Sequence, residues 1–244
     1  MSEIIYGRNP VQEALRLGRS LNRILISNSV SRHDISEILE LARERGVIYQ
    51  FADKKKLDYL ANGKHQGIIA MVAGGQYVEL SDLLGTTRTS ETNSFLVLLD
   101  NIQDPRNLGA IIRTADAVQA DGIIIPRRNA AGLTGASVKA SAGTSAHMPV
   151  ARVGNMNNAI QTLRENGFWL IGLATDGPTP FNKIDYRGPV ALIIGGEDKG
   201  IRPLVKRNCD EVVHLPMAGH AGSFNASVAA ALVFYEVFKQ RNEI

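Results

Sequence analysis

The sequence predicts an α/β protein of two domains, and three features of the chain indicate it. From residue 1 to 73, short apolar segments alternate with amphipathic helical segments, which is typical of a small layered α/β domain. From 94 to 244, apolar strand segments alternate with helical ones, which favours a mainly parallel sheet covered on both faces. Between them, residues 74–93 are rich in Gly, Thr and Ser, so we predict a linker there, in which 78–84 could form a helical turn.

In the N-terminal domain, the predicted helices begin at capping residues and the first two end at glycines. Asn9-Pro10 begins a helix that runs to Leu17, Asp34 begins a second that ends before Gly46, and Asp53 begins a third. The apolar segments between them are the predicted strands, at 23–26, 47–51 and 67–72.

The C-terminal domain alternates in the same way. Its predicted strands are 95–99, 122–125, 168–174, 190–194 and 212–215, and its predicted helices lie near 107–119, 134–142, 156–166, 201–207 and 226–239.

The first helix of this domain has a distinct pattern. Leu108, Ile111, Ile112 and Ala115 form one apolar stripe, and Arg113 lies off it. A plain reading is a solvated helix with Asn107 as its N-cap. If the helix begins earlier, Arg106 and Arg113 share a basic face, because only the small Ala110 lies between them.

Composition limits the classes of protein that fit. The 244 residues carry a formal net charge of +3 with a pI near 9.0, which permits RNA binding through a local basic patch. No apolar run approaches ~20 residues and no signal peptide is visible, so we expect a cytoplasmic protein without a membrane span. Cys209 is the single cysteine and the histidines are scattered, so we expect no disulfide and no metal site.

The chain has none of the usual phosphate-binding signatures. The segment from Gly195 to Gly200 comes near a P-loop, but Ile201 replaces the lysine. A phosphate-rich cofactor is therefore disfavoured. S-adenosylmethionine fits better, because glycines allow close backbone approach and apolar side chains such as Met217 and Phe224 can pack on an adenine, although core packing is the plainer role for both.

Three ordered motifs carry a family resemblance. They are Asn107, Gly109 and Arg113; Gly195, Glu197 and Gly200; and Pro216, Met217, Gly219, Ser223, Asn225 and Ser227. Together they resemble the motifs of the SpoU/TrmH family of RNA ribose 2'-O-methyltransferases. The segments IIYGRNPVQEAL and HQGIIA are also similar to members that methylate a guanosine ribose of bacterial 23S rRNA.

The resemblance implies a fold and an assembly. It implies a C-terminal domain of the SPOUT type, in which the last segment passes through a loop to form a trefoil knot that binds S-adenosylmethionine. It further implies an N-terminal RNA-binding domain resembling ribosomal protein L30e. The family works as a homodimer whose catalytic residues meet across the subunit interface.

The resemblance also implies roles for particular residues. The catalytic set is Asn107, Arg113, Glu197, Ser223 and Asn225. The cofactor set is Ala174, Thr175, Gly195, Gly196, Leu215, Met217, Gly219 and Phe224. The substrate RNA set is Arg8, Asn9, His65, Gln66 and Arg106. The plain alternatives are capping roles for Ser223 and Asn225 and an exposed loop carboxylate for Glu197.

Asp198 departs from the family pattern, since glycine is usual after the motif glutamate, and Phe224 and Ala226 are milder departures. The expected function is methylation of a ribose 2'-hydroxyl in rRNA. The alternatives are a tRNA substrate, or a non-catalytic RNA-binding protein that keeps the fold.

Overall fold

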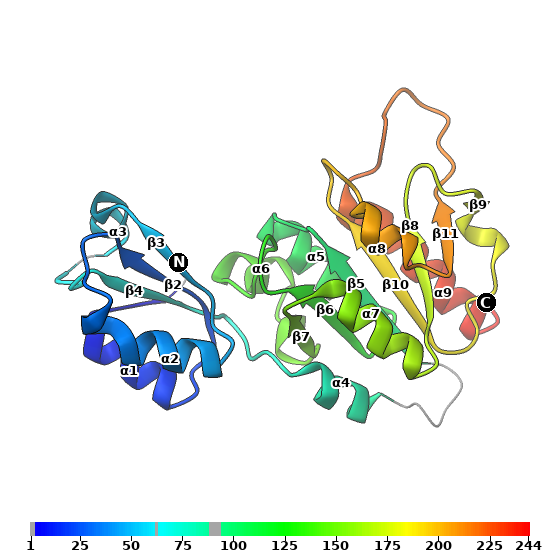
Figure 1. Ribbon diagram of the computed structural model, residues 1–244. Helices are drawn as coiled ribbons and strands as arrows, with labels where there is room; N and C mark the ends of the chain where they lie inside the picture. Colours follow the sequence, from blue (N-terminus) through cyan, green and yellow to red (C-terminus); the bar gives the residue numbers. More distant parts are fainter. Residues whose placement is uncertain (1–2, 62, 88–93) are drawn as a thin grey trace. The chain divides into compact units, whose positions relative to one another are not determined.

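The computed structural model describes residues 3–61, 63–87 and 94–244, and the chain forms two compact units (Figure 1). Unit 1 consists of Met1–Gln76 together with Gly132–Ala136, and unit 2 consists of Tyr77–Ala131 together with Ser137–Ile244. A short internal segment of the C-terminal half therefore packs with the N-terminal unit, which the sequence pattern did not indicate.

Unit 1 is a four-stranded sheet with helices on its faces. Its elements are β1 (Ile4–Tyr6), α1 (Arg8–Arg16), β2 (Leu21–Ser27), a 3-10 turn (His33–Ile35), α2 (Ser36–Glu44), β3 (Tyr49–Ala52), α3 (Lys54–Leu60) and β4 (Ile68–Val72). The strand order is β1-β4-β2-β3, with β2 parallel to β3 and antiparallel to β4. Apolar side chains of α1 and α2 form the larger core, whereas Leu57 of α3 belongs to a smaller one.

The boundaries in unit 1 correct two predictions. The first helix begins at Arg8 after Gly7, whose φ of 100° suits glycine, and not at Asn9. The second helix begins at Ser36, because Asp34 lies inside the preceding 3-10 turn and does not cap α2. Strand β1 was not predicted, since its three residues are too short to show a period.

Unit 2 contains the predicted parallel sheet. Its strands are β5 (Phe95–Asp100), β6 (Gly122–Pro126), β7 (Val150–Val153), β8 (Trp169–Leu173), β9 (Thr179–Pro180), β10 (Val190–Gly195) and β11 (Glu211–His214). The order is β7-β6-β5-β10-β8-β11-β9, and every pairing is parallel. The prediction of a mainly parallel sheet is confirmed. The sequence did not predict β7 and β9, which are short.

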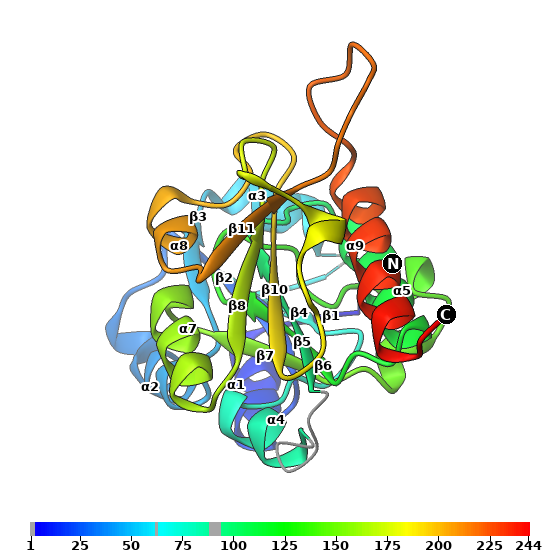
Figure 2. The same cartoon turned by 90° about the vertical axis from the view of Figure 1, so that its right-hand side faces the viewer.

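Helices cover both faces of this sheet (Figure 2). They are α4 (Leu80–Thr86), α5 (Pro105–Ala117), α6 (Gly135–Ala140), α7 (Met156–Glu165), α8 (Pro203–Arg207) and α9 (Ala226–Arg241). The helices α4, α7 and α8 share one core beneath the sheet, while α5 packs against α9 on the other side. The four apolar stripe residues of α5 are all buried, as predicted.

The start of α5 differs from the prediction in a way that affects the site. Asp104, and not Asn107, is the N-cap: its side chain accepts a hydrogen bond from the backbone N–H of Arg106 at 2.8 Å. Pro105 is the first helical residue, a position that needs no N–H partner. The early start places Arg106, Ala110 and Arg113 on one face, one turn apart each.

The predicted linker contains an element of unit 2. Leu83 of α4 is 1% exposed and belongs to the core beneath the sheet, and Val78 forms a bridge with Ala151 of β7. Residues 88–93 of the predicted linker lie outside the described residues.

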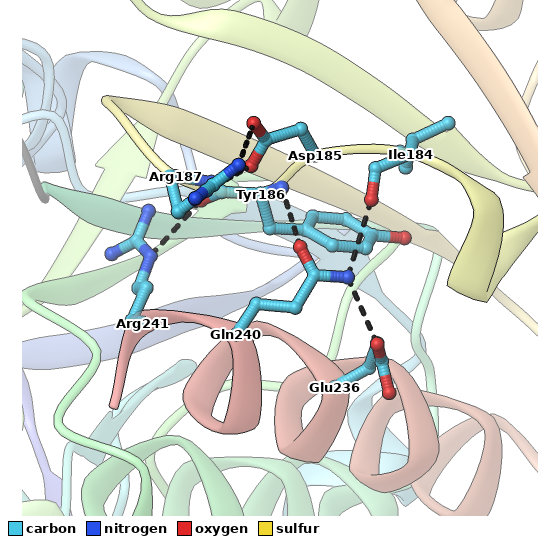
Figure 3. A network of polar contacts seen from close by, with 7 residues as sticks. All are labelled: Ile184, Asp185, Tyr186, Arg187, Glu236, Gln240 and Arg241. Carbon is cyan, nitrogen blue, oxygen red and sulfur yellow. Dashed lines mark hydrogen bonds and ion pairs between the residues drawn. The ribbon is translucent and has the colours of Figure 1, made fainter. Parts of the chain in front are cut away.

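The C-terminal turn of α9 is fixed by a polar network (Figure 3). Gln240 accepts a hydrogen bond from the N–H of Tyr186 and donates to the carbonyl of Ile184, and Arg241 donates to the carbonyls of Tyr186 and Gly188. Burial raises the pKa of the Tyr186 phenol and lowers that of Arg241 to about 10. One end of α9 is thus anchored, while its other end lies at the candidate site.

Within the described ranges, no helix is long and apolar enough to cross a membrane. The same ranges contain no group of His, Cys, Asp and Glu side chains that could hold a metal ion.

Candidate active site

A cavity of about 680 Å³ lies at the carboxyl edge of the unit 2 sheet. The carboxyl ends of parallel strands meet at one edge, and there the loops after β8, β10 and β11 form its walls. Seven of the eight predicted cofactor residues line it: Ala174, Thr175, Gly195, Gly196, Leu215, Met217 and Phe224. The eighth, Gly219, lies in the same loop as Met217 but is not part of the lining.

The walls combine apolar and charged groups. Leu215 is buried, whereas Met217 and Phe224 are each 39% exposed and therefore available for contact with a ligand. Asp176 and Lys206 also line the cavity and form an ion pair of 2.5 Å, which lowers the pKa of Asp176. Neither residue was singled out in the sequence, because the loops that carry them have no motif.

The glycines of the β10 loop are required by the loop itself. A Cβ on Gly195 would lie 2.1 Å from the carbonyl carbon of Gly200, and one on Gly196 would lie 2.4 Å from the backbone oxygen of Asn101. We predicted that these glycines admit a ligand. The nearest atoms are backbone, so the first role of Gly195 is to let the loop fold closely on itself, and that of Gly196 is to let it approach the loop after β5.

Three residues of the predicted catalytic set meet, each from a different motif, and one of them, Glu197, lines the cavity. The amide of Asn107, in the first turn of α5, donates to Oε1 of Glu197 in the β10 loop. The amide nitrogen of Asn225 lies 3.2 Å from both Oδ1 of Asn107 and Oε1 of Glu197. This polar triad joins positions that are 90 and 118 residues apart in the chain.

Asn225 has two roles at once. Its side-chain oxygen accepts hydrogen bonds from the N–H groups of Ser227 and Val228, so it is the N-cap of α9. Its nitrogen holds the triad. The capping role foreseen from the sequence therefore coexists with a place in the site. Ser223 lies two residues earlier, exposed and in the cavity lining.

Arg113 is not part of the triad. It is exposed on α5, and the described residues give it no hydrogen bond or ion pair. Arg106 is likewise exposed on the same face, where only its backbone N–H is used, in the cap.

The predicted RNA-binding residues of unit 1 come together around one turn. The N–H of Arg8 donates to Oε1 of Gln66 at 3.0 Å, and the Arg8 guanidinium pairs with Asp34 at 3.2 Å. Asn9 and Gln66 are exposed. His65 is only 5% exposed: its Nε2 is 2.8 Å from Asp58, and its Nδ1 accepts from Gly67. His65 therefore braces the turn that presents Gln66.

Two family models cover most of the chain. The one for the SpoU rRNA Methylase family matches residues 94–235, and the one for RNA 2'-O ribose methyltransferase substrate binding matches residues 4–78. Among curated relatives, a protein of Staphylococcus saprophyticus is 42% identical over 241 residues, 99% of this chain and 97% of the relative. YacO of Bacillus subtilis is 42% identical over 242 residues, with the same coverage. Both are named as TrmH family tRNA/rRNA methyltransferases.

Two solved structures are similar over nearly the whole chain, and a third over two thirds of it. The SpoU methyltransferase AviRb of Streptomyces viridochromogenes, in complex with AdoMet, has a TM-score of 0.64 and 27% identity, over 99% of this chain and 91% of that one. An AdoMet-bound rRNA methyltransferase of Sinorhizobium meliloti has a TM-score of 0.63 and 26% identity, over 100% and 88%. A TrmH/SpoU tRNA modifying enzyme of A. aeolicus has a TM-score of 0.56 and 26% identity, but covers 67% of this chain and 83% of that one.

Proposed function

Because the chain belongs to the SpoU family of RNA methyltransferases, we propose that it methylates a ribose 2'-hydroxyl in rRNA with S-adenosylmethionine, a guanosine of 23S rRNA being its target. The observation that carries the proposal is the triad of Asn107, Glu197 and Asn225, one residue from each motif, which adjoins the cavity through Glu197. A functional site requires such a convergence, whereas a helix cap at Asn225 and an exposed loop carboxylate at Glu197 do not need it.

The cavity suits this cofactor. Its volume lies within the range of about 300–1,000 Å³ that is usual for small-molecule sites. Apolar side chains, Leu215, Met217 and Phe224, offer contacts for an adenine. The carboxylates of Glu197 and Asp198 favour a cationic sulfonium, whereas that of Asp176 is already paired with Lys206. We assign the backbone of Ala174, Thr175, Gly195, Gly196 and Gly219 to the remaining contacts. When bound, the cofactor supplies an electrophilic methyl group.

The chain's own residues orient and activate the hydroxyl. Arg113 has a pKa too high for a general base, so we assign it to the substrate phosphate and to the charge that develops on the 2'-oxygen. The proton then passes to the phosphate oxygen that Arg113 holds in place. Asn107 and Asn225 position the ribose, Glu197 fixes both amides, and Ser223 contributes a hydroxyl at the cavity wall.

The position of Arg113 supports a homodimer. The described residues give this arginine no partner in its own protomer, which suits a residue that serves the site of a second copy. Val228, Leu232 and Tyr235 of α9 are 47%, 42% and 58% exposed and recur at helical spacing, so they form an apolar stripe beside α5. We propose that this stripe is the dimer contact. We also propose the trefoil knot of the SPOUT type, with the segment between β11 and α9 in the threaded part.

We assign unit 1 to the RNA substrate, through Arg8, Asn9 and Gln66, with His65 as their brace, and Arg106 to the RNA near the triad. The match of residues 4–78 to a substrate-binding family supports this. An rRNA substrate is favoured over tRNA because the A. aeolicus tRNA modifying enzyme covers only 67% of this chain, whereas the S. meliloti rRNA methyltransferase covers all of it.

The test is a map of 2'-O-methylated nucleotides in total RNA from cells with and without the gene, restored by the wild-type protein or by Asn107→Ala. We expect one rRNA site to be lost and to return only with the wild type. Loss of a tRNA site instead would identify tRNA as the substrate. An unchanged map, together with absent S-adenosylmethionine binding in calorimetry, would leave the non-catalytic alternative.

A further inference from the structure

Two adjacent arginines stand at the carboxyl end of β6, next to the strand that leads into the triad. The N–H of Arg127 donates to the carbonyl of Val153 at 2.8 Å, and the N–H of Ala131 donates to the carbonyl of Ile102 at 2.7 Å. These bonds fix the loop that begins at Arg127 against β7 on one side and against the loop after β5 on the other. Arg128 is exposed, and the described residues give its guanidinium no hydrogen bond or ion pair.

A third arginine lies behind this pair. The guanidinium of Arg152, on β7, stacks over the ring of Tyr77 at 4.6 Å and donates to the carbonyl of Arg127 at 3.3 Å. Burial lowers the pKa of Arg152, and the charge of Arg127 lowers it further. Arg152 therefore holds the backbone from which Arg127 and Arg128 extend.

Within the described residues, the charges of Arg127 and Arg128 have only one carboxylate near them. The carboxylate of Glu79 lies 3.7 Å from Arg127 and is 69% exposed, which makes it a weak, solvent-screened counterion. Three other arginines of unit 2 have closer carboxylates: Arg164 with Asp210 at 3.0 Å, Arg187 with Asp185 at 2.8 Å and Arg202 with Asp100 at 2.6 Å. Two neighbouring exposed or half-buried arginines, Arg127 and Arg128, with one distant carboxylate between them favour an external anion.

We propose that Arg127 and Arg128 bind backbone phosphates of the RNA next to the modified nucleotide, with Arg152 as their positioning residue. Neighbouring strands lie about 4.8 Å apart, so the end of β6 is one strand from the end of β5, and the loop after β5 leads to Arg106 on α5. Guanidinium groups suit phosphate because they donate two parallel hydrogen bonds. The proposal rests on the proposed function and extends its RNA surface into unit 2.

The test measures binding of a fluorescently labelled single-stranded RNA of mixed sequence to the full-length protein over a range of salt concentrations. We compare wild type, Arg127→Ala/Arg128→Ala, and Arg207→Ala, which removes an exposed arginine of α8. The double variant should bind more weakly, and its slope of log affinity against log salt should be shallower by about 1.4, for two single-strand phosphate contacts. Arg207→Ala should keep the wild-type slope.

Two further variants keep the test decisive. Arg128→Ala alone removes a side chain without a partner among the described residues, so the variant should fold. Its salt slope should change by about half as much as that of the double variant. Arg127→Lys/Arg128→Lys should restore the salt slope but only part of the affinity, because lysine keeps the charge and loses the two-pronged geometry. Double-alanine binding equal to that of Arg207→Ala would overturn the proposal.

S-adenosylmethionine affinity and methyl transfer, measured on the same proteins, separate this proposal from the proposed function. If the wild type transfers no methyl group but the double variant still has the shallower salt slope, the proposed enzymatic activity is refuted and the phosphate site stands. If both proteins methylate RNA and have the same half-saturating RNA concentration, only the phosphate site is refuted.

Discussion

Arg202 and the buried Asp100, 102 residues apart in the chain, form an ion pair that joins the two loops leading to Asn107 and carrying Glu197. Asp100 is 0% exposed and accepts hydrogen bonds from the backbone N–H and from Nε of Arg202, both at 2.8 Å. Asp100 ends β5, just before the loop that leads to Asn107. Arg202 closes the loop that carries Glu197. The contact therefore fixes the relative position of the two loops that meet in the triad.

Arg202→Ala should destabilise unit 2 by about 1–3 kcal/mol, because the buried carboxylate of Asp100 would keep only the backbone N–H of residue 202, while the 50% exposure of the Arg202 side chain screens the lost charge pair. Urea unfolding measures this. The matched control is Arg187→Ala, which breaks an ion pair whose partners are 68% and 57% exposed and should cost less than about 1 kcal/mol. Equal losses in the two variants would show that the Asp100 contact contributes no more than a surface pair.

Arg113→Ala should abolish methyl transfer and leave S-adenosylmethionine affinity within a few-fold of the wild type. The reason is its place on α5, outside the cavity lining and outside the triad. Methyl transfer from labelled cofactor and calorimetry measure the two quantities. Near wild-type activity would remove Arg113 from the chemistry, and loss of cofactor binding would place it in the cavity instead.

The two roles of Asn225 can be separated by substitution. Asn225→Asp keeps the oxygen that caps α9 but replaces the nitrogen that contacts Glu197 with a second negative oxygen, so activity should fall while stability is retained. Asn225→Ala should lose activity and also about 1 kcal/mol of stability, because the cap is removed. Full activity in the Asp variant would reduce Asn225 to a helix cap.

The sequence predicted local features well and long-range contacts poorly. The apolar stripe of α5 is buried because a helical period is written in neighbouring residues. Three helix starts were predicted wrongly, at Asn9, Asp34 and Asn107, since several residues nearby compete for the capping position. In the candidate site, the motif residues were found by resemblance to a family. The contact between Asp100 and Arg202 was missed, because no local pattern links the end of a strand to a loop so far along the chain.

Glycine at position 195 shows a limit of the same kind. The sequence says that a side chain is absent there, but not what takes its place. The structure puts the backbone of Gly200 and Ile201 there, so Gly195→Val should disturb the loop and lower stability as well as cofactor binding. Thermal unfolding alongside calorimetry checks this. An unchanged melting temperature with lost binding would mean that the ligand, and not the loop, needs the space.

Leu232→Glu should convert the proposed dimer into monomers. It places a charge in the centre of the exposed stripe of α9, where burial against a second copy would be costly. Light scattering gives the mass, with Leu204→Glu on α8 as the control, because Leu204 is 57% exposed and lies away from the stripe. A monomeric wild type, or a Leu232→Glu protein that stays dimeric, would contradict the proposed interface.

Point variants test the RNA-binding role of unit 1 better than its deletion does. Residues 132–136 belong to this unit, and the carbonyl of Leu133 accepts from the N–H of Gly74 at 2.6 Å, so deletion of the unit would expose the buried Leu133.

Arg8→Ala should weaken binding of an rRNA fragment and make the salt slope shallower by about 0.7 to 0.9, the value for one phosphate contact. Arg16→Ala, on the same helix and paired with Glu37, is the control and should keep the slope. Cofactor affinity should be unchanged in both variants, because unit 2 alone lines the cavity. Identical salt slopes for Arg8→Ala and Arg16→Ala would show that Arg8 makes no phosphate contact.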